Sequence, residues 1–258
     1  MKLIDTHAHL QFKAYDPDRD EVVKRNSEQL KAVINVGSSI ATSEGGAKLA
    51  EKIDNFYAAV AIHPHHFDHW YKNSYSQLEN LGKNKKVVAV GEIGLDKHSY
   101  QGSPKPDLAV QAKMLHQQID LARKLKVPVI LHCREAYDEL YKEIQQYKGR
   151  LTGVVHCFMG TKNQAKKFLD LGLHISFTGN ITYKKNNNLR EIAKMIPNNK
   201  ILTETDAPYL PPEPYRGKRN EPIYVKMVAV TLAGVKGWGL QETIGITAQN
   251  AKELFNIP

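Results

Sequence analysis

Residues 87–94 read VVAVGEIG, a β-branched and apolar run with a glutamate, Glu92, near its end. A nearly continuous apolar run of this length is typical of a strand that is buried on both faces. Such strands belong to parallel sheets that are covered by helices. The run therefore predicts one strand of a parallel sheet, with Glu92 close to the carboxyl end of that strand.

Seven further runs of the same kind occur along the chain, with helical patterns between them. The predicted strands cover residues 2–7, 32–37, 57–63, 87–94, 127–133, 152–158, 174–179 and 201–206. The clearest helical pattern covers residues 106–125, and residues 240–255 predict a last helix that closes the fold.

The predicted strand ends recur at a regular interval. From His7 through Asn35, His63, Glu92, His132, His156, Gly179 and Asp206 the steps are 28, 28, 29, 40, 24, 23 and 27 residues. Each step fits one βα unit, and the long step contains the insertion DKHSYQGSPKP at residues 96–106. Eight such units predict an α/β fold, a (β/α)8 TIM-type barrel; an open doubly wound sheet is the alternative. Since no linker or low-complexity tract divides the chain, we expect residues 1–258 to form a single barrel domain.

The cysteine count, the absence of long apolar stretches and the net charge indicate in which compartment and with which kind of partner the protein works. The two cysteines, Cys133 and Cys157, form no disulfide framework and favour a reducing compartment. Neither a signal peptide nor an apolar stretch long enough for a membrane span is visible, so we expect a cytoplasmic protein without membrane association, and a monomer. The formal net charge of +9 favours an anionic partner such as nucleic acid, although a lysine-rich solubilising surface accounts for it equally well.

Histidines and carboxylates gather at six of the predicted strand ends. They are His7 and His9; His63, His65 and His66; Glu92 and Asp96; His132, beside Arg134; His156; and Glu204 and Asp206. In a barrel of this type the carboxyl ends of the strands meet at one face, so these side chains predict a metal site. The ligand types suit Mg, Mn or Zn, and they suffice for two divalent ions bridged by Glu92. Two such ions activate a water and stabilise charge on phosphorus, while Asp206 serves as ligand and proton acceptor.

Eight motifs, in order, cover nearly the whole chain: DTHAHL, IHPH, GEIGLD, PVILHCREA, VHCFMG, SFTGNIT, ETDAPYLPP and YRGKRNEP. With these motifs the sequence resembles the TatD family of metal-dependent deoxyribonucleases, within the wider amidohydrolase-like barrels. The resemblance implies a TIM-type barrel, two divalent ions and hydrolysis of phosphodiester bonds in DNA, often from the 3′ end.

The resemblance also implies roles for individual residues. His7, His9, Glu92 and Asp206 correspond to ligands of the first ion, and Glu92, His132 and His156 to ligands of the second. His63 and His65 are expected to contact the substrate phosphate. Glu204 is expected close to the metals or the leaving group, with an outward-facing strand carboxylate as the alternative. The catalytic set is therefore Glu92, Glu204 and Asp206.

Two departures from the family pattern are visible. Lys97 and His98 stand where the family usually has an aromatic pair, and Met159 stands where it usually has serine. Neither departure falls on a ligand position. The departure at Lys97 and His98 affects how a base or a leaving nucleoside stacks at the edge of the predicted site.

Basic residues and aromatic residues also fall on the loops of the predicted catalytic face. Arg134 and Arg219 are expected to contact the substrate, with Lys184, Lys185, Arg216 and Lys218 nearby. For Arg134 the alternative is a side chain that points away from the site. Phosphate contacts of this kind give salt-sensitive binding without sequence specificity. Tyr209, Tyr215 and Trp70 are candidates for stacking on bases, or are exposed aromatics without that role.

Together these observations predict a hydrolase that cleaves phosphodiester bonds of DNA, as a 3′–5′ exodeoxyribonuclease on single-stranded substrate. One alternative is hydrolysis of another ester or an amide on the same scaffold, such as deacylation of aminoacyl-tRNA. Against an amide substrate, the bridging position at strand four is Glu92, where amide-hydrolysing relatives commonly carry a carboxylated lysine. The other alternative is a metalloprotein that binds nucleic acid without turnover; the ligand set argues against it, because it leaves coordination positions open.

Overall fold

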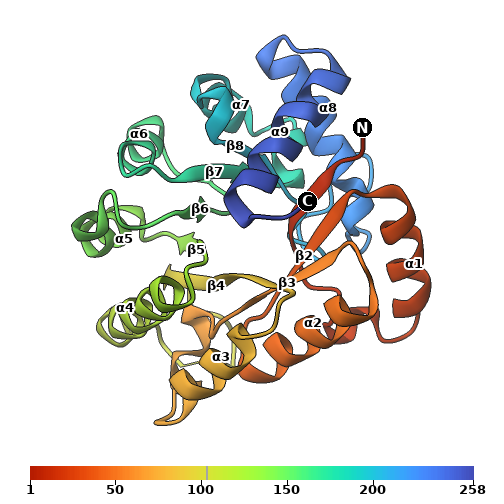
Figure 1. The fold of residues 1–258 in the computed structure, drawn as a ribbon. Coiled ribbons are helices and arrows are strands. Elements are labelled where there is room, and N and C mark those ends of the chain that lie inside the picture. Colours follow the sequence, from red (N-terminus) through yellow and green to blue (C-terminus); the bar gives the residue numbers. More distant parts are fainter. Residues whose placement is uncertain (103) are drawn as a thin grey trace.

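Eight parallel strands form one sheet, in which they follow each other in chain order (Figure 1). The computed structural model describes residues 1–102 and 104–258. The strands are β1 (Ile4–Ala8), β2 (Ala32–Val36), β3 (Phe56–Val60), β4 (Val87–Asp96), β5 (Val129–Arg134), β6 (Gly153–Val155), β7 (His174–Phe177) and β8 (Ile201–Thr203).

The last strand returns to the first. Ala8 and Ala207 form a parallel bridge, and Thr6 Oγ1 donates to the carbonyl of Thr203 at 3.1 Å. The amide of His9 donates to the carbonyl of Ala207 at 2.7 Å. These contacts nearly close the sheet into a cylinder, and the predicted (β/α)8 TIM-type barrel is confirmed.

Helices alternate with the strands and surround them (Figure 1). They are α1 (Arg19–Gln29), α2 (Ile40–Lys52), α3 (Ser74–Gly82), α4 (Leu108–Leu125), α5 (Tyr137–Ile144), α6 (Lys162–Asp170), α7 (Asn187–Met195), α8 (Val225–Lys236) and α9 (Leu240–Phe255). Short 3-10 helices occur at Lys13–Tyr15, Pro64–His69, Gln145–Tyr147, Gly179–Thr182, Asn198–Lys200 and Pro222–Tyr224. Within the described ranges no single helix is long and apolar enough to span a membrane; Pro222–Lys236 and Leu240–Phe255 reach that length only together, bent by 110°.

The predicted elements agree with the observed ones, apart from their ends. α4 starts at Leu108 because the Asp107 side chain caps it by accepting the amides of Ala109 and Val110. β6 and β8 end before the predicted strands do, so that His156 and Glu204 lie just beyond the sheet. The insertion at residues 96–106 follows β4, and Ser103 within it lies outside the described residues.

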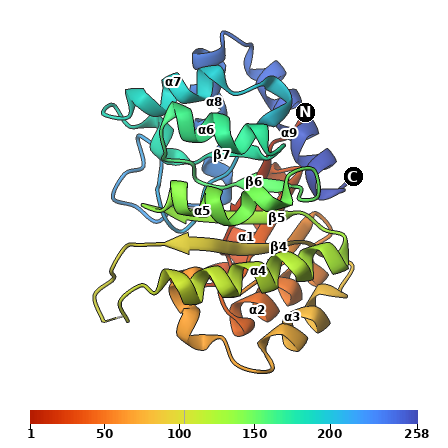
Figure 2. The same ribbon diagram turned by 90° about the vertical axis from the view of Figure 1, so that its left-hand side faces the viewer.

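Two buried clusters lie on opposite faces of the sheet. In β2, Ile34 belongs to one cluster and Val33 to the other, as alternate strand residues must. The larger cluster contains helix residues such as Leu115 and packs the helices onto the barrel. The smaller one joins the strands to Phe255 of α9, so α9 closes the interior at one end. In Figure 2 both termini lie on the side opposite to that toward which β4 points, so the chain ends lie away from the carboxyl end of this strand.

Candidate metal centre

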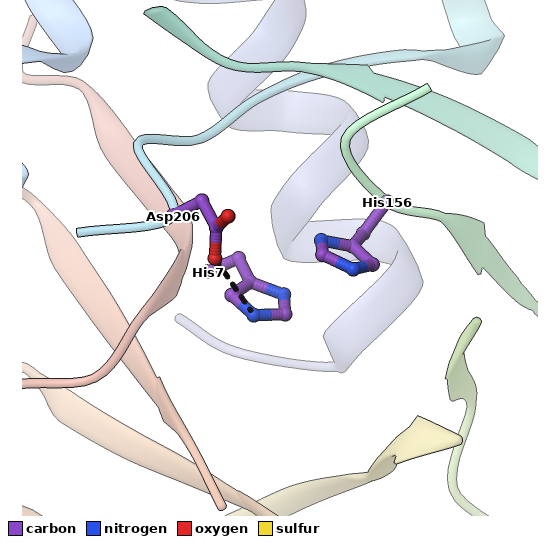
Figure 3. Close-up of side chains that lie close together, drawn as sticks. All are labelled: His7, His156 and Asp206. Atoms are coloured by element: carbon purple, nitrogen blue, oxygen red, sulfur yellow. Dashed lines mark ion pairs between the residues drawn. The ribbon is translucent and has the colours of Figure 1, made fainter. Parts of the chain in front are cut away.

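Side chains from five strands converge at the carboxyl end of the barrel. His7 lies in β1 and His9 directly after it, Glu92 lies in β4 and His132 in β5, while His156 and Asp206 follow β6 and β8. Figure 3 shows His7, His156 and Asp206 turned toward one another from three different segments. All six predicted metal ligands therefore lie in one cluster.

The first half of the cluster has the dimensions of a metal site. Its atoms are the Nε2 atoms of His7 and His9, Oε2 of Glu92 and Oδ1 of Asp206. His7 Nε2 lies 3.2 Å from His9 Nε2 and 3.6 Å from both carboxylate oxygens. His9 Nε2 lies 3.4 Å from Asp206 and 4.0 Å from Glu92. Ligand atoms about 2.1 Å from a tetrahedral ion stand roughly 3.4 Å apart. His7, His9 and Glu92 therefore fit one divalent ion, with Asp206 close to both histidines.

Hydrogen bonds fix the ring of His9 and the backbone of His7 in this half. His9 Nδ1 lies 2.7 Å from the carbonyl of Val36, and since a carbonyl only accepts, Nδ1 carries the proton and Nε2 presents its lone pair to the cluster. Asp5, fully buried, accepts the amides of His7 and Thr205 and also the Thr205 hydroxyl. Asp5 thereby ties β1 to the segment after β8, the two segments that supply His7 and Asp206.

The second half centres on the other oxygen of Glu92. Oε1 lies 2.6 Å from His132 Nδ1 and 2.7 Å from His156 Nε2, and these two nitrogens are 3.3 Å apart. The ligand atoms of Glu92, His132 and His156 all lie within 4.8 Å of one another, as do those of His7, His9 and Glu92. Each oxygen of Glu92 therefore faces a different group of histidines.

Carboxylates hold both histidines of the second half from behind. Asp96 Oδ2 lies 3.2 Å from His132 Nε2, so this nitrogen donates outward and leaves Nδ1 free for a metal. Glu204 Oε1 lies 3.4 Å from His156 Nδ1. Glu204 is buried and also accepts the Cys157 amide at 2.6 Å and the Ser176 hydroxyl at 2.8 Å.

Glu204 therefore lies close to the predicted metal centre, beside the ligand His156. Its oxygens also accept the Cys157 amide and the Ser176 hydroxyl, so it helps to orient His156. It is only 1% exposed and is not the outward-facing carboxylate of the alternative.

The two carboxylates of the cluster carry negative charge at neutral pH. Burial alone raises the pKa of Glu92, but His156, His63 and His132 outweigh burial, and the pKa lies well below its ordinary value. Burial also raises the pKa of Asp206, but the hydrogen bond from His9 and the charge of His7 lower it. The pKa of Asp206 therefore lies below its ordinary value. Both carboxylates are therefore ionised at neutral pH. Burial and then the charge of His156 lower the pKa of His7, which keeps a lone pair available.

The predicted phosphate contacts, His63 and His65, lie at the edge of the cluster on Pro64–His69 and the residue before it. His63 Nδ1 accepts the amide of His65 at 3.0 Å, so Nε2 carries the proton and points at Glu92 Oε1, 3.3 Å away. Burial lowers the pKa of His63 to about 4, and the ring is neutral. His63 therefore offers an N–H donor beside Glu92, whereas the ring of His65 packs edge-on against Tyr100 at 4.2 Å.

Arg134 and Arg219, both expected to contact substrate, lie in different surroundings. Arg134 is exposed at the end of β5, where Nη1 donates to the hydroxyl of Tyr100 at 2.7 Å. Tyr100 in turn donates to Asp96 Oδ2 at 3.1 Å, so Arg134 is linked to the carboxylate behind His132. Arg219 instead makes two hydrogen bonds to Asp18, of 2.7 and 2.6 Å, and its guanidinium lies over the ring of Tyr15. These contacts tie the loop before α8 to the start of α1 and engage the guanidinium of Arg219 within the protein.

The departures noted in the sequence fall outside the cluster. Lys97 pairs with Glu139, and Met159 is 57% exposed. Both cysteines are free, and Cys133 is buried.

Sequence reasoning missed several supporting residues: Asp5, Thr205, Ser176, Tyr100 and Phe12. Asp5 stands in the motif DTHAH and Thr205 in TETDAP, and a signal existed there, since polar residues in buried strand ends need partners. Phe12 stacks on the ring of His9, with centroids 4.5 Å apart and planes at 13°. Nothing in the sequence around Phe12 indicated that contact.

Comparison with known proteins gives the family. The model of the family described as TatD related DNase matches residues 4–256. YabD of Bacillus subtilis, an uncharacterized metal-dependent hydrolase, is 37% identical over 99% of both chains. The 3′-5′ ssDNA/RNA exonuclease TatD of Erwinia billingiae is 32% identical over 99% of this chain and 100% of its own. The crystal structure of YJJV, a TatD homologue of Escherichia coli K12, superposes with a TM-score of 0.92 at 31% identity and covers 99% of this chain and 98% of that one. The chain, with its cluster of histidines and carboxylates at the mouth of the barrel, therefore belongs to the TatD family and is a metal-dependent hydrolase.

Proposed function

We propose that this protein is a metal-dependent deoxyribonuclease that hydrolyses phosphodiester bonds of single-stranded DNA and removes nucleotides from the 3′ end. One observation carries the proposal: the two oxygens of Glu92 face two separate groups of histidines, 3.6 Å from His7 Nε2 and 2.6 Å from His132 Nδ1. A bridging carboxylate between two ligand groups suits a pair of Mg, Mn or Zn ions. When bound, such a pair supplies an activated water and stabilises negative charge on a phosphoryl group.

The residues of the chain take complementary roles in this proposal. Asp206 belongs to the first ligand group and is ionised, so it also accepts the proton of the attacking water. His63 directs its N–H into the site and donates to an oxygen of the scissile phosphate. Arg134, whose Nη1 is held by Tyr100, binds a neighbouring phosphate with its remaining donors. Glu204 and Asp96 act through His156 and His132 by holding their orientation.

The relatives support a nucleic acid as the substrate, since three of them are named 3′-5′ ssDNA/RNA exonucleases. The exposed cations Lys184, Lys185, Arg216 and Lys218 on loops that follow β7 and β8 fit a polyanion. Hydrolysis of another ester, such as an aminoacyl ester of tRNA, is the second candidate. The N–H donors of His63 and Arg134 favour the phosphodiester, because they add to the charge compensation that a phosphoryl centre requires.

Cleavage of DNA oligonucleotides labelled at the 3′ or the 5′ end tests this proposal. Protein freed of metal by a chelator is assayed alone and after addition of Mg or Mn, with Glu92→Ala as the matched control. We expect metal-dependent shortening from the 3′ end, and none in the variant. Absence of cleavage with every metal, in protein that binds two ions, would exclude the nuclease and direct the search to aminoacyl esters.

We further propose that the protein acts as a monomer in the cytoplasm. Both cysteines are free in the structure, which agrees with a reducing compartment.

A further inference from the structure

Tyr209 is an exposed aromatic residue beside the metal centre. Large hydrophobic side chains with high exposure in the described parts of the chain are Met1, Tyr71, Val110, Met159, Tyr209 and Val230. Of these, Tyr209 alone has a recorded ring contact with a predicted metal ligand: it is 54% exposed, and its ring meets that of His9 edge-on at 6.3 Å. An aromatic face left in water next to a polar site is suited to a flat, apolar part of a ligand.

The backbone of Tyr209 is held firmly although its ring is exposed. Its amide donates to the carbonyl of Asp206 at 2.8 Å, and its carbonyl accepts the side-chain amide of Asn220 at 2.6 Å. Asn220 is fully buried and also donates to the carbonyl of Thr205. Tyr209 therefore keeps a fixed position relative to Asp206, three residues earlier in the same turn.

A second aromatic residue extends this side of the site. Phe12 is half-buried and stacks in parallel on His9, and its amide donates to the carbonyl of His9 at 3.0 Å. Arg19 Nη2 donates to the carbonyl of Phe12 at 3.1 Å. Phe12 and Tyr209 thus contact the same imidazole from two directions and form an aromatic wall beside the first ligand group.

The other two aromatic candidates from the sequence, and Tyr100, have packing or ring contacts away from the predicted ligands. Tyr215 stacks on Tyr224 with centroids 4.1 Å apart and planes at 7°. Trp70 packs against the core, and the ring of Tyr100 lies under the guanidinium of Arg134, 5.2 Å away. Among the sequence candidates, Tyr209 combines high exposure with a ring contact to a predicted metal ligand.

We propose that Tyr209, which like Phe12 contacts the ring of His9, stacks on the base of a nucleotide that flanks the phosphate held at the metal centre. The inference rests on the proposed function and adds a substrate requirement to it. Stacking needs a base that is unpaired and turned out of a duplex, so the contact selects single-stranded ends. Because every base offers an aromatic face, the contact tolerates any sequence.

The first test combines a protein variant with a change in the substrate. Cleavage of three single-stranded oligonucleotides is compared: one unmodified, one with an abasic terminal nucleotide and one with an abasic penultimate nucleotide. Stacking on one base corresponds to a factor of between about 5 and 150, so Tyr209→Ala is expected to lower kcat/KM on the unmodified strand by such a factor. On the oligonucleotide that lacks the stacked base, the variant and the original protein are expected to be equal. Tyr209→Phe keeps the ring and is expected to retain activity on all three.

Tyr71→Ala is the matched control, since Tyr71 is 63% exposed in the loop before α3 and donates only its backbone amide, to Ser74. It is expected to leave all three rates unchanged. Loss of activity in Tyr209→Ala that is equally large on all three oligonucleotides would overturn the inference. So would a loss in Tyr209→Phe as large as that in Tyr209→Ala, because the hydroxyl and not the ring would then be responsible.

A binding measurement separates this inference from the proposed nuclease activity. The metal-loaded protein is titrated by calorimetry with dAMP and with 2-deoxyribose 5-phosphate, which differ only in the base. Tighter binding of dAMP, lost in Tyr209→Ala, is expected even if no oligonucleotide is cleaved. Equal affinity for the two ligands would exclude a base-binding wall, whether or not the protein is a nuclease.

Discussion

Asp96 lies behind His132, with Oδ2 3.2 Å from the Nε2 atom that faces away from the metal centre. The opposite nitrogen, Nδ1, lies 2.6 Å from Glu92 Oε1. A carboxylate that accepts the outer N–H of a histidine fixes its tautomer and makes the inner nitrogen a better ligand. The same arrangement recurs at His156, where Glu204 takes the outer position at 3.4 Å.

The substitution Asp96→Asn tests this support. We expect the ion held by the second ligand group to bind about 10- to 100-fold more weakly, because the amide no longer fixes the proton on Nε2 of His132. Calorimetric titration of metal-free protein with Mn²⁺ measures the affinity. Tyr100→Phe removes the other donor to the same oxygen without touching His132 and is expected to have a smaller effect. Unchanged affinity in Asp96→Asn would show that His132 is oriented without Asp96.

Glu204→Gln is expected to reduce catalysis through His156. One oxygen of Glu204 accepts the Cys157 amide and faces His156, while the other accepts the Ser176 hydroxyl. The variant should stay folded but lose metal affinity by about 10- to 100-fold. Ser176→Ala removes one donor and keeps the carboxylate, so a loss below about 10-fold is expected. If kcat falls in Glu204→Gln while metal affinity stays the same, Glu204 contacts the reacting groups after all.

Arg134 and Arg219 are expected to respond differently to substitution. Arg134→Gln should raise KM for DNA and reduce the slope of log affinity against log salt by about 1, because one phosphate contact is lost. Arg219→Gln should leave that slope unchanged and lower the melting temperature by about 2–4 °C, since it breaks a partly exposed ion pair with Asp18 worth about 1 kcal/mol. Salt titrations of DNA binding and thermal unfolding of both variants check this contrast. A reduced salt slope in Arg219→Gln would return that residue to the substrate site.

The stability of the folded protein is expected to depend on pH through His174. It starts β7, at the end of the barrel opposite the metal centre, in a hollow of about 510 Å³ that Lys200 and Glu253 also line. Burial, and then the charge of Lys200, lower the pKa of His174 from 6.5 to about 4. Between these values the unfolded chain binds a proton that the folded protein does not. The stability that neutral His174 contributes is therefore complete above pH 6.5 and is lost as the pH falls toward 4.

Urea unfolding at neutral pH and at a pH midway between those two values measures this contribution. His174→Gln should lose less stability than the original protein over that step, because glutamine does not titrate. Protonation of the metal ligands affects both proteins equally and cancels in the comparison. An identical loss in both proteins would mean that His174 takes up its proton in the folded state as readily as in the unfolded one.

The barrel was predictable because its signal is local and repeated. Each βα unit carries its own apolar strand, and the regular spacing of the strand ends requires only counting. The convergence of these side chains was predictable for the same reason: topology brings the carboxyl ends of parallel strands to one face, so His7 and His132 both approach Glu92 although 125 residues separate them in the sequence.

The rest depends on contacts that no local pattern encodes. His9 presents Nε2 because the Val36 carbonyl, on the next strand, takes Nδ1. Arg219 looks like a phosphate ligand in the sequence, yet Asp18, 201 residues away, engages it. The aromatic wall of Phe12 and Tyr209 likewise joins the first and last βα units, and its geometry follows only from the closure of the barrel.

The most direct test of the central claim is the binding of Mn²⁺ to metal-free protein, followed by calorimetry and electron paramagnetic resonance. If Glu92 bridges two ions, the protein binds two Mn²⁺ per chain, their spins are exchange-coupled, and Glu92→Ala abolishes the coupled signal. A single ion per chain, or two uncoupled ions that are indifferent to Glu92→Ala, would contradict a bridged pair.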